Sequence, residues 1–351
     1  MKTIRNILLG MLAVAFTVAC SEDNKLGDPI HLEPPYPLPE KGHSEAEDRV
    51  VDFYYKYNTF LLYDYTEEDF SYGNNSSMEY QSLPGDVKYL GAMLDLLEEV
   101  WLDLYPEEFK VRYFPFKIYL VDQLSTTNKW SGLPTYYDYA VRTSDIVIAG
   151  MNESLNSLTA KDKQKLKCII NNAYLSFLLN QKDADGNSLL DIPKEFYEIS
   201  DYKKDFITNA NYQAEGNPDK HLEFGYLPNL DGQYATNQGE LLPDGTYGGL
   251  IAPWALSVYT TNSASDLKHF LANMVMIGDD FPTYPDYPST PLVTSPFVPW
   301  TNHYTWDYYL QQKEDGSYKF PRIKQKLDIL ENYFKGNFDL DLRAIGNKKF
   351  E

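Results

Sequence analysis

Hydrophobic residues recur along the middle of this chain with the spacing of an amphipathic helix. The most regular stretch is Thr159–Gln181, where apolar residues return every three or four positions and define one core-facing side. A second helix is predicted over Asp86–Tyr105, and a third over 44–58, where Ser44 and Glu47 have the spacing of a capping box. Weaker helical patterns follow at 193–206, 265–276 and 322–333.

Short apolar runs predict strands in the first half of the chain. These runs are Thr59–Tyr63, Lys117–Val121 and Asp145–Ala149. Because the strands come early and most helical patterns come later, the sequence predicts an α+β fold. It would have a small N-terminal sheet, a central helix and a helical C-terminal part. The sequence shows no internal repeat.

The first twenty residues have the pattern of a lipoprotein signal. Lys2 and Arg5 give a positive start, Ile7–Val18 is apolar, and Ala19 stands directly before Cys20. The apolar stretch is too short for a bilayer, which takes about 20 residues, so it predicts a removable signal over residues 1–19. We expect acylation of Cys20, an acidic and Pro-rich tether over residues 20–43, and one domain over residues 44–351.

The composition excludes several classes of protein. With 43% hydrophobic and 15% aromatic residues, the chain has enough apolar side chains for a sizeable core. A formal net charge of -20 repels phosphate, so nucleic-acid binding is not expected, and the lipid on Cys20 must supply the membrane attachment. With Cys20 acylated, Cys168 has no intrachain partner, and two cysteines cannot form a thiolate zinc site.

Motifs that carry chemistry are scarce. The five histidines are never three or four residues apart, so no helix offers a metal a pair of imidazoles. The segment Asp183–Asn187, followed by Asp191, has oxygen-bearing side chains at alternate positions, as calcium loops do. Gly186 and Lys194 are out of register with such a loop, so a solvated Asp-Gly turn after the long helix is the better interpretation.

An aromatic and proline-rich stretch, Phe281–Tyr309, is the candidate ligand-binding segment. Aromatic side chains offer large contact area at low entropic cost, which suits a platform for sugar rings or for a partner protein. The residues that would form this platform are Trp300, Tyr304, Trp306 and Tyr308. The alternative is that these rings pack the loops onto the core.

Several segments carry a resemblance to a known family through their order and texture. They are Tyr55–Asn58, Val100–Tyr105, Ile118–Val121, Ile146–Asn152, Gln181, Ile192–Ser200, Gly249–Ala255 and Ile323–Leu342. From residue 45 to about 345, the chain in this way resembles the zinc-binding metallopeptidase lipoproteins of Bacteroidota. The acidic residues after Cys20 are similar to the surface-export signal of such lipoproteins. The resemblance implies a lipid-anchored outer-membrane protein, exposed at the cell surface, with SusC/SusD-type nutrient-uptake proteins as partners.

The same resemblance implies a zincin-like domain whose central helix carries HExxH, in which two His bind zinc and the Glu activates water. Aligned on Gln181, those five positions are Ala173, Tyr174, Leu175, Ser176 and Phe177, and the helix that would give a third ligand falls near His269–Asn273. The resemblance therefore implies a catalytically inactive homologue, with no metal or other cofactor, that binds a peptide, a glycan or a partner protein.

Two other functions stay open at this point. One is an active hydrolase with scattered zinc ligands, in which His221, His269 and His303 come together in space. The other is a glycan-binding accessory lipoprotein that uses the aromatic stretch. The first requires imidazoles that converge on one point, and the second requires exposed rings.

Overall fold

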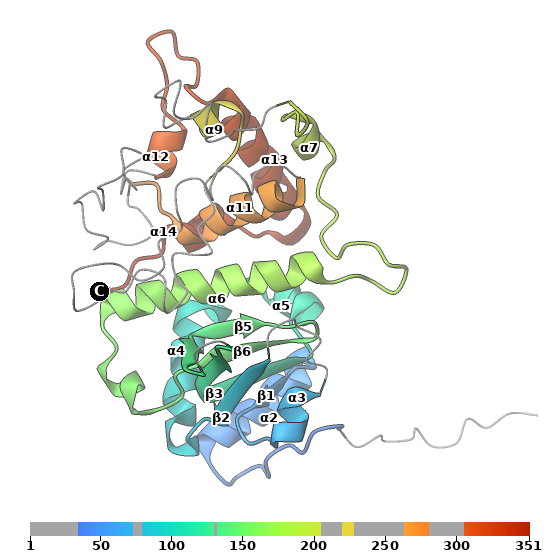
Figure 1. The fold of residues 1–351 in the computed structure, drawn as a ribbon, viewed down its shortest axis with the longest axis vertical. Helices are drawn as coiled ribbons and strands as arrows, with labels where there is room; N and C mark the ends of the chain where they lie inside the picture. Colours follow the sequence, from blue (N-terminus) through green and yellow to red (C-terminus); the bar gives the residue numbers. More distant parts are fainter. Residues whose placement is uncertain (1–33, 73–78, 130–131, 205–219, 228–262, 281–304) are drawn as a thin grey trace, which may run out of the picture. The chain divides into compact units, whose positions relative to one another are not determined.

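A six-stranded mixed sheet and the long helix α6 (Ala160–Asn180) organise the described part of this computed structural model (Figure 1). The structure describes residues 34–72, 79–129, 132–204, 220–227, 263–280 and 305–351. The chain divides into two compact units, Met1–Leu38 and Pro39–Glu351, and the described helices and strands all belong to the second. The predicted signal, Cys20 and the first part of the predicted tether lie outside the described residues.

The sheet is built around its longest strand, β3. Over its first half β3 pairs in parallel with β1 and β6, and β5 closes the order β1-β3-β6-β5 in antiparallel fashion. Over its second half β3 pairs antiparallel with β2 on one side and β4 on the other. The strands are β1 (Phe60–Leu62), β2 (Tyr80–Pro84), β3 (Lys117–Thr127), β4 (Pro134–Tyr137), β5 (Tyr139–Val141) and β6 (Asp145–Ala149).

The helices lie before, between and after these strands. Those in the first half are α2 (Glu45–Tyr57), α3 (Glu67–Ser71), the 3-10 turn η1 (Val87–Tyr89), α4 (Leu90–Val100), η2 (Leu102–Leu104), α5 (Glu107–Tyr113) and η3 (Glu153–Ser157). Those that follow α6 are α7 (Glu195–Glu198), α9 (Lys220–Glu223), α11 (Ser263–Met276), α12 (Trp306–Tyr309), α13 (Pro321–Phe338) and α14 (Leu342–Asn347). No described helix is long and apolar enough to cross a membrane.

The predicted central helix is confirmed at both ends. Thr159 caps α6, because its hydroxyl accepts the backbone N–H of Asp162 while the Asp162 carboxylate accepts the N–H of Thr159, and Gln181 is the C-cap. Ser44 likewise caps α2 by accepting the N–H of Glu47. The strand predicted at Asp145–Ala149 is also confirmed. The mixed composition of the fold confirms α+β.

Two predicted helices are wrong in extent. The helix predicted over Asp86–Tyr105 is interrupted at Trp101, where the backbone leaves helical geometry (φ -142°, ψ -64°) and the indole is fully buried. Its ring packs against Phe114 and Tyr174, so burial of the indole, rather than helical periodicity, sets the chain direction here. Of the helix predicted at 193–206, only Glu195–Glu198 is helical among the residues described there.

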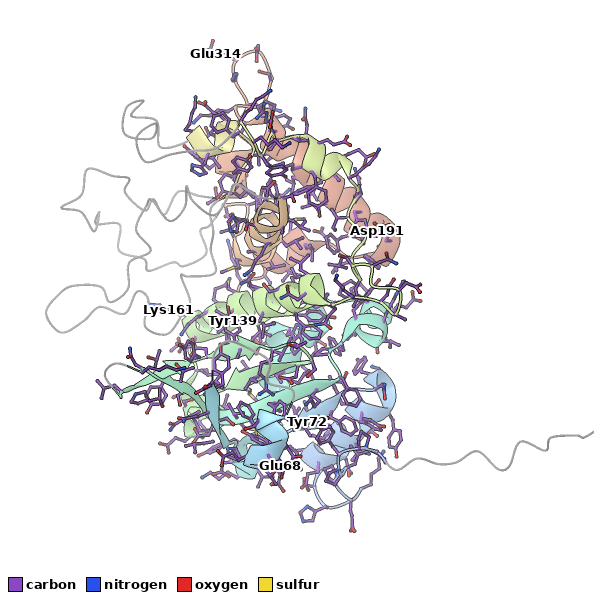
Figure 2. The ribbon with its side chains drawn as sticks, turned by 45° about the vertical axis from the view of Figure 1, so that its right-hand side comes forward. Glu68, Tyr72, Tyr139, Lys161, Asp191 and Glu314 are labelled. Atoms are coloured by element: carbon purple, nitrogen blue, oxygen red, sulfur yellow. The ribbon has the colours of Figure 1, made fainter. Side chains whose placement is uncertain are left out.

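Helix α6 is buried on more sides than its sequence predicts. It contacts α4, β5 and β6, and it packs against α11 of the C-terminal helices; Figure 2 shows Tyr139 of β5 beside the start of α6, where Lys161 lies. From Lys167 to Leu175 every residue is buried, including Lys167, Asn171 and Asn172. The prediction of a single core-facing side is therefore wrong for the middle of this helix.

The same hairpin geometry occurs twice in the structure, although the sequence shows no internal repeat. After α6, Lys182 forms a bridge with Ser188, and the turn closes with Asp183 N donating to Asn187 O at 2.9 Å. After α12, Gln312 forms a bridge with Tyr318, and Lys313 N donates to Ser317 O at 2.8 Å. The turn glycines Gly186 and Gly316 have φ of 84° and 81°. Glu314, near the tip of the second hairpin, points away from the helices in Figure 2.

Candidate functional site

The middle of α6, where the family resemblance places a metal site, is filled by core side chains. Ala173, Tyr174, Leu175 and Phe177 are all buried. The ring of Tyr174 lies 5.1–5.5 Å from those of Trp101, Tyr105 and Phe114, and its burial raises the pKa of its hydroxyl well above 10. Tyr174 is therefore a neutral core residue.

These positions do not fit zinc. Zinc is held by imidazole, thiolate or carboxylate groups, and Ala173–Phe177 supply none of them. Helix α11, which would give a third ligand, does pack against α6. Its only carboxylate, Asp266, is bound to a lysine. Within the part of the chain that the structure describes, no group of three His, Cys, Asp or Glu side chains could hold a metal ion.

Polar side chains in the middle of α6 form hydrogen bonds to the ends of two other helices, α14 and α4. Lys167 Nζ donates to the carbonyl oxygens of Ile345 and Gly346 at 2.9 and 2.8 Å, at the C-terminal end of α14. Asn171 Nδ2 donates to the Val100 oxygen at 2.8 Å, at the end of α4. Helix ends carry unpaired carbonyls and partial negative charge, so these contacts stabilise the packing of three helices. Burial lowers the pKa of Lys167.

Of the three histidines proposed as zinc ligands, the two that the structure describes lie on different helices. His221 is buried on α9 and His269 is buried on α11, while His303 lies outside the described residues. Neither His221 nor His269 belongs to a three-residue group suited to a metal in the described chain. Cys168 is a buried thiol, and its Sγ lies 3.4 Å from the Met276 oxygen in the α6–α11 contact.

A buried ion pair joins the C-terminal helices. Lys326 of α13 donates to the Asp266 carboxylate at 2.5 Å, to Ser200 Oγ at 2.7 Å and to the Gly225 oxygen at 2.8 Å, with both charged side chains fully buried. Tyr202 also donates to Asp266, at 2.7 Å. Rings of Phe196, Tyr202, Tyr226 and Phe270 surround the ammonium group at 5.0–5.7 Å. The pair has the partners that make a buried charge tolerable, so we assign it a structural role.

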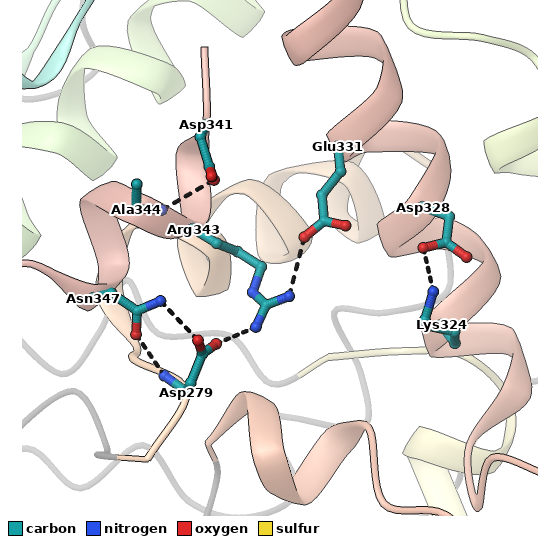
Figure 3. A network of polar contacts seen from close by, with 8 residues as sticks. All are labelled: Asp279, Lys324, Asp328, Glu331, Asp341, Arg343, Ala344 and Asn347. Atoms are coloured by element: carbon teal, nitrogen blue, oxygen red, sulfur yellow. Dashed lines mark hydrogen bonds and ion pairs between the residues drawn. The ribbon is translucent and has the colours of Figure 1, made fainter. Parts of the chain in front are cut away.

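A second network surrounds Arg343 of α14 (Figure 3). Its guanidinium pairs with Asp279 and, at 3.1 Å, with Glu331 of α13. Asn347 fixes Asp279 further by donating to its carboxylate at 2.9 Å and accepting its N–H at 2.7 Å. An open hollow of about 650 Å³ lies beside this network. All of these charged groups are already bonded to one another, so the network holds α13 and α14 to the end of α11.

The more promising hollow, of about 500 Å³, lies where β6 ends and the chain turns toward α6. Gly150, at φ 98°, makes this turn, and its N–H donates to the Asp122 oxygen at 3.1 Å. We call this hollow the β6 cleft. Its apolar lining is Leu96, Leu124, Ala149, Leu155, Leu158 and Leu166. Its polar lining is Asp122, Gln123, Tyr136, Tyr137, Asp138, Ser154, Ser157, Asp162 and Lys165.

The charges of the β6 cleft are largely paired. Asp138 forms an ion pair with Lys165 at 2.7 Å, and Asp122 accepts from Asn152 Nδ2 at 2.6 Å. Asp162 is engaged in capping α6, and the hydrogen bonds from Thr159 lower the pKa of its carboxyl. A cleft with an apolar part and a few fixed polar groups is the usual form of a small-ligand site. It offers binding rather than an evident acid, base or nucleophile.

Sequence reasoning missed this cleft because it missed β4, which contributes Tyr136 and Tyr137 to the lining. It also missed β2, which pairs with β3 on the other side. β2 and β4 are short and mostly polar, with Pro84 and Pro134 at their ends, and proline usually argues against a strand. Both are nonetheless compatible with sheet edges, since each pairs only with β3. The sequence signal for β4 was an alternation of apolar and polar residues around Tyr136. This alternation is too short to distinguish a strand from a loop.

The proposed aromatic platform is only partly within the described residues. Trp300 and Tyr304 lie outside them. Trp306, which opens α12, is fully buried and packs against Tyr309 and under the Arg343 guanidinium, so its assignment to an exposed platform is wrong. Tyr308 is partly buried against the core, near Phe320 and Lys319. For Trp306 the alternative interpretation, packing onto the core, holds.

The calcium-like segment forms a turn closed by its own backbone. The Asp183 carboxylate accepts the N–H groups of Asp185 and Asn187 at 2.9 and 2.8 Å, which lowers the pKa of Asp183. This is the Asp-Gly turn that the sequence favoured over a calcium loop.

Comparisons with known proteins give limited information. Neither a protein-family profile nor a curated protein matches this sequence. A solved structure of "a putative zinc-binding metallo-peptidase from Bacteroides caccae" is similar over 89% of this chain and 92% of that one, with 15% sequence identity and a TM-score of 0.44. A likeness at this level carries no argument about activity.

Proposed function

We propose that this chain is a lipid-anchored protein of the outer-membrane surface that acts by binding rather than by catalysis. In this proposal Cys20 carries the lipid, and residues 20–43 form the tether. Residues 44–351 form a zincin-like domain that has lost its metal site. The protein would bind a peptide or a glycan in nutrient acquisition, together with SusC/SusD-type uptake proteins.

The middle of α6 carries this proposal. In a zinc peptidase of this kind, the central helix must present ligands to an open cleft. Here Ala173–Leu175 and Phe177 are packed in the core, and Lys167 and Asn171 bind the ends of α14 and α4. A helix whose side chains are packed against other elements in this way has a structural role. The β6 cleft, at the N-terminal end of the same helix, is the better place for a ligand.

The test is metal content and peptidase activity of the full-length lipoprotein purified in detergent. We expect less than stoichiometric zinc after dialysis against zinc-containing and then zinc-free buffer, and no cleavage of a mixed peptide library. Stoichiometric zinc together with cleavage would refute the proposal. The triple variant Ala173→His, Tyr174→Glu, Phe177→His carries the HExxH pattern and is compared with the natural chain for zinc content and peptide cleavage.

The location is tested separately. We expect metabolic labelling with palmitate, and protease sensitivity on intact cells, for the natural chain. Cys20→Ser should lose the lipid label and leave the membrane fraction, because in this proposal the lipid on Cys20 supplies the membrane attachment. Cys168→Ser is the matched control, since this thiol is buried in the α6–α11 contact, and it should keep both properties.

A further inference from the structure

One face of the β2–β3–β4 sheet is open to solvent. Residues directly opposite in paired strands share a face, and alternate residues along a strand return to it. The register pairs Leu83 with Gln123, Gln81 with Ser125, Ser125 with Tyr136, and Thr127 with Pro134. These seven residues therefore form one surface, which we call the β2–β4 face. Ser125 is half-buried and the other six are exposed, with Leu83 at 53% and Tyr136 at 49%.

The β2–β4 face continues into the β6 cleft. Gln123 and Tyr136 belong to both, since they also line the cleft. An extra residue in β3 near Asp122, opposite the Leu83–Pro84 step, interrupts the alternation of the strand at the point where face and cleft meet. The first half of β3 is covered by the core, with Ile118 and Leu120 buried. In the second half Gln123 and Thr127 are exposed, so the cleft lies where the buried part of β3 meets its exposed part.

No member of the β2–β4 face carries a charge. This contrasts with the chain as a whole, in which 23% of residues are charged and the formal net charge is -20. Glu79 and Lys129, next to the ends of β2 and β3, have opposite signs and lie 4.0 Å apart. In the cleft, Asp138 is already paired with Lys165. A cationic or anionic ligand would find no opposite charge on this face to form an ion pair. A neutral ligand needs no such partner.

We propose that the β2–β4 face and the adjoining cleft bind a neutral polysaccharide, an inference that rests on the binding role proposed above. The exposed ring of Tyr136 offers a flat apolar surface for the CH groups of a pyranose ring. Gln81, Gln123, Ser125 and Thr127 offer amide and hydroxyl groups, which can both donate to and accept from sugar hydroxyls. A three-stranded surface suits an extended chain of sugars, and the cleft admits one end or a branch.

The experiment is affinity electrophoresis of the full-length chain, in detergent, through gels that contain single polysaccharides. The neutral set is starch, xylan, mannan and a mixed-linkage glucan, and the charged set is pectin and chitosan. We expect at least one neutral polymer to slow the protein, equally at low and high salt, because screening weakens only charge-dependent binding. Tyr136→Ala should weaken retention by about tenfold or more, as expected for a central aromatic contact.

Matched variants keep the result interpretable. Tyr55→Ala removes a tyrosine of α2 that is 73% exposed, and it should bind as the natural chain does. Gln81→Ala and Gln123→Ala alter exposed side chains without touching the core, so they test the face even if Tyr136→Ala folds poorly. Each should weaken retention severalfold. Sedimentation velocity of the natural chain and of Tyr136→Ala shows whether the face joins two copies instead.

Three outcomes would overturn the inference. The first is retention by no neutral polymer, whether or not the charged polymers retain the protein. The others are retention that is unchanged in all three face variants, and self-association that Tyr136→Ala abolishes. These outcomes leave the proposed function untouched, because that proposal fails on zinc content, peptide cleavage or membrane location, none of which the gels measure.

Discussion

At the scale of a single residue, the hydroxyl of Tyr174 shows how the middle of α6 is packed. The side chain is fully buried among other rings, and its hydroxyl has no hydrogen-bond partner in the described structure. A buried polar group without a partner costs about 1–3 kcal/mol. Nothing in the packing explains why tyrosine stands here rather than phenylalanine.

This gives a prediction for two variants of Tyr174. Tyr174→Phe should leave the free energy of unfolding unchanged or raise it by about 1 kcal/mol, because it removes the unpaired hydroxyl and keeps the ring. Tyr174→Ala should lower it by about 3–5 kcal/mol, since it leaves a cavity among the rings. Urea denaturation measures both. A Phe variant as unstable as the Ala variant would show that the hydroxyl has an important partner.

The buried ion pair gives a second prediction at this scale. Lys326→Met leaves Asp266 buried without its cation, which should cost about 3–5 kcal/mol of unfolding free energy. Replacing both partners, Lys326→Met with Asp266→Leu, should cost less than the sum of the single changes, because they share one interaction. Lys335→Met, at the exposed pair with Asp339, is the control and should change stability little. Additive losses would mean that the two charges are not coupled.

At the scale of an element, the N-terminal cap of α6 should make part of the stability depend on pH. Hydrogen bonds from the Thr159 side chain and backbone lower the pKa of Asp162 in the folded chain. The ionised carboxylate is therefore favoured by folding. Its contribution is complete above the unfolded pKa of about 3.9 and disappears as the pH falls through the lower folded pKa.

We therefore expect Asp162→Asn to be less stable than the natural chain at neutral pH, and the difference to shrink below pH of about 4. Thr159→Ala should cost about 1 kcal/mol at neutral pH. Asp64→Asn, at an exposed carboxylate outside any helix cap, should show neither effect. Urea denaturation at several pH values measures this, and a difference between Asp162→Asn and the natural chain that persists undiminished at a pH of about 3 would contradict it.

The elements also show how much of the fold the sequence could predict. Helix α6 and strand β6 were predicted with their observed ends because each has a strong local signal, a regular apolar periodicity or an apolar run followed by glycine. β2 and β4 were missed because their residues gain stability only by pairing with β3, which lies distant in the sequence from β2. The β6 cleft is lined by β4, and the β2–β4 face needs both strands, so neither could be predicted.

The repeated hairpin was missed for a related reason. Its two copies share Gln181 with Gln311 and the Asp-Gly pair at 185–186 with that at 315–316, while most other positions differ. Backbone hydrogen bonds and a positive φ at glycine define the turn, and these constrain few side chains. Each copy ends in a buried apolar residue, Leu190 or Phe320, just before the next helix or turn. A common backbone is therefore visible only in the structure.

At the scale of the whole molecule, the excess of 51 acidic over 31 basic residues should oppose folding by mutual repulsion. Many of the described ion pairs lie at the surface, where each contributes little and is weakened by salt. Screening therefore removes more repulsion than attraction. Raising the ionic strength from about 0.01 to 0.1 M shortens the screening length from about 30 to 10 Å. Repulsion between exposed carboxylates that lie farther apart than this length is then largely screened.

We expect the free energy of unfolding, measured in urea, to rise over this range of NaCl and to rise equally in KCl. Equal effects of the two salts identify screening rather than binding of a particular cation. Binding of a neutral polysaccharide to the uncharged β2–β4 face should not depend on salt in this way. Salt should therefore change the stability of the whole chain without changing its affinity for the polysaccharide. A fall in stability with salt would mean that attractive pairs outweigh the excess negative charge.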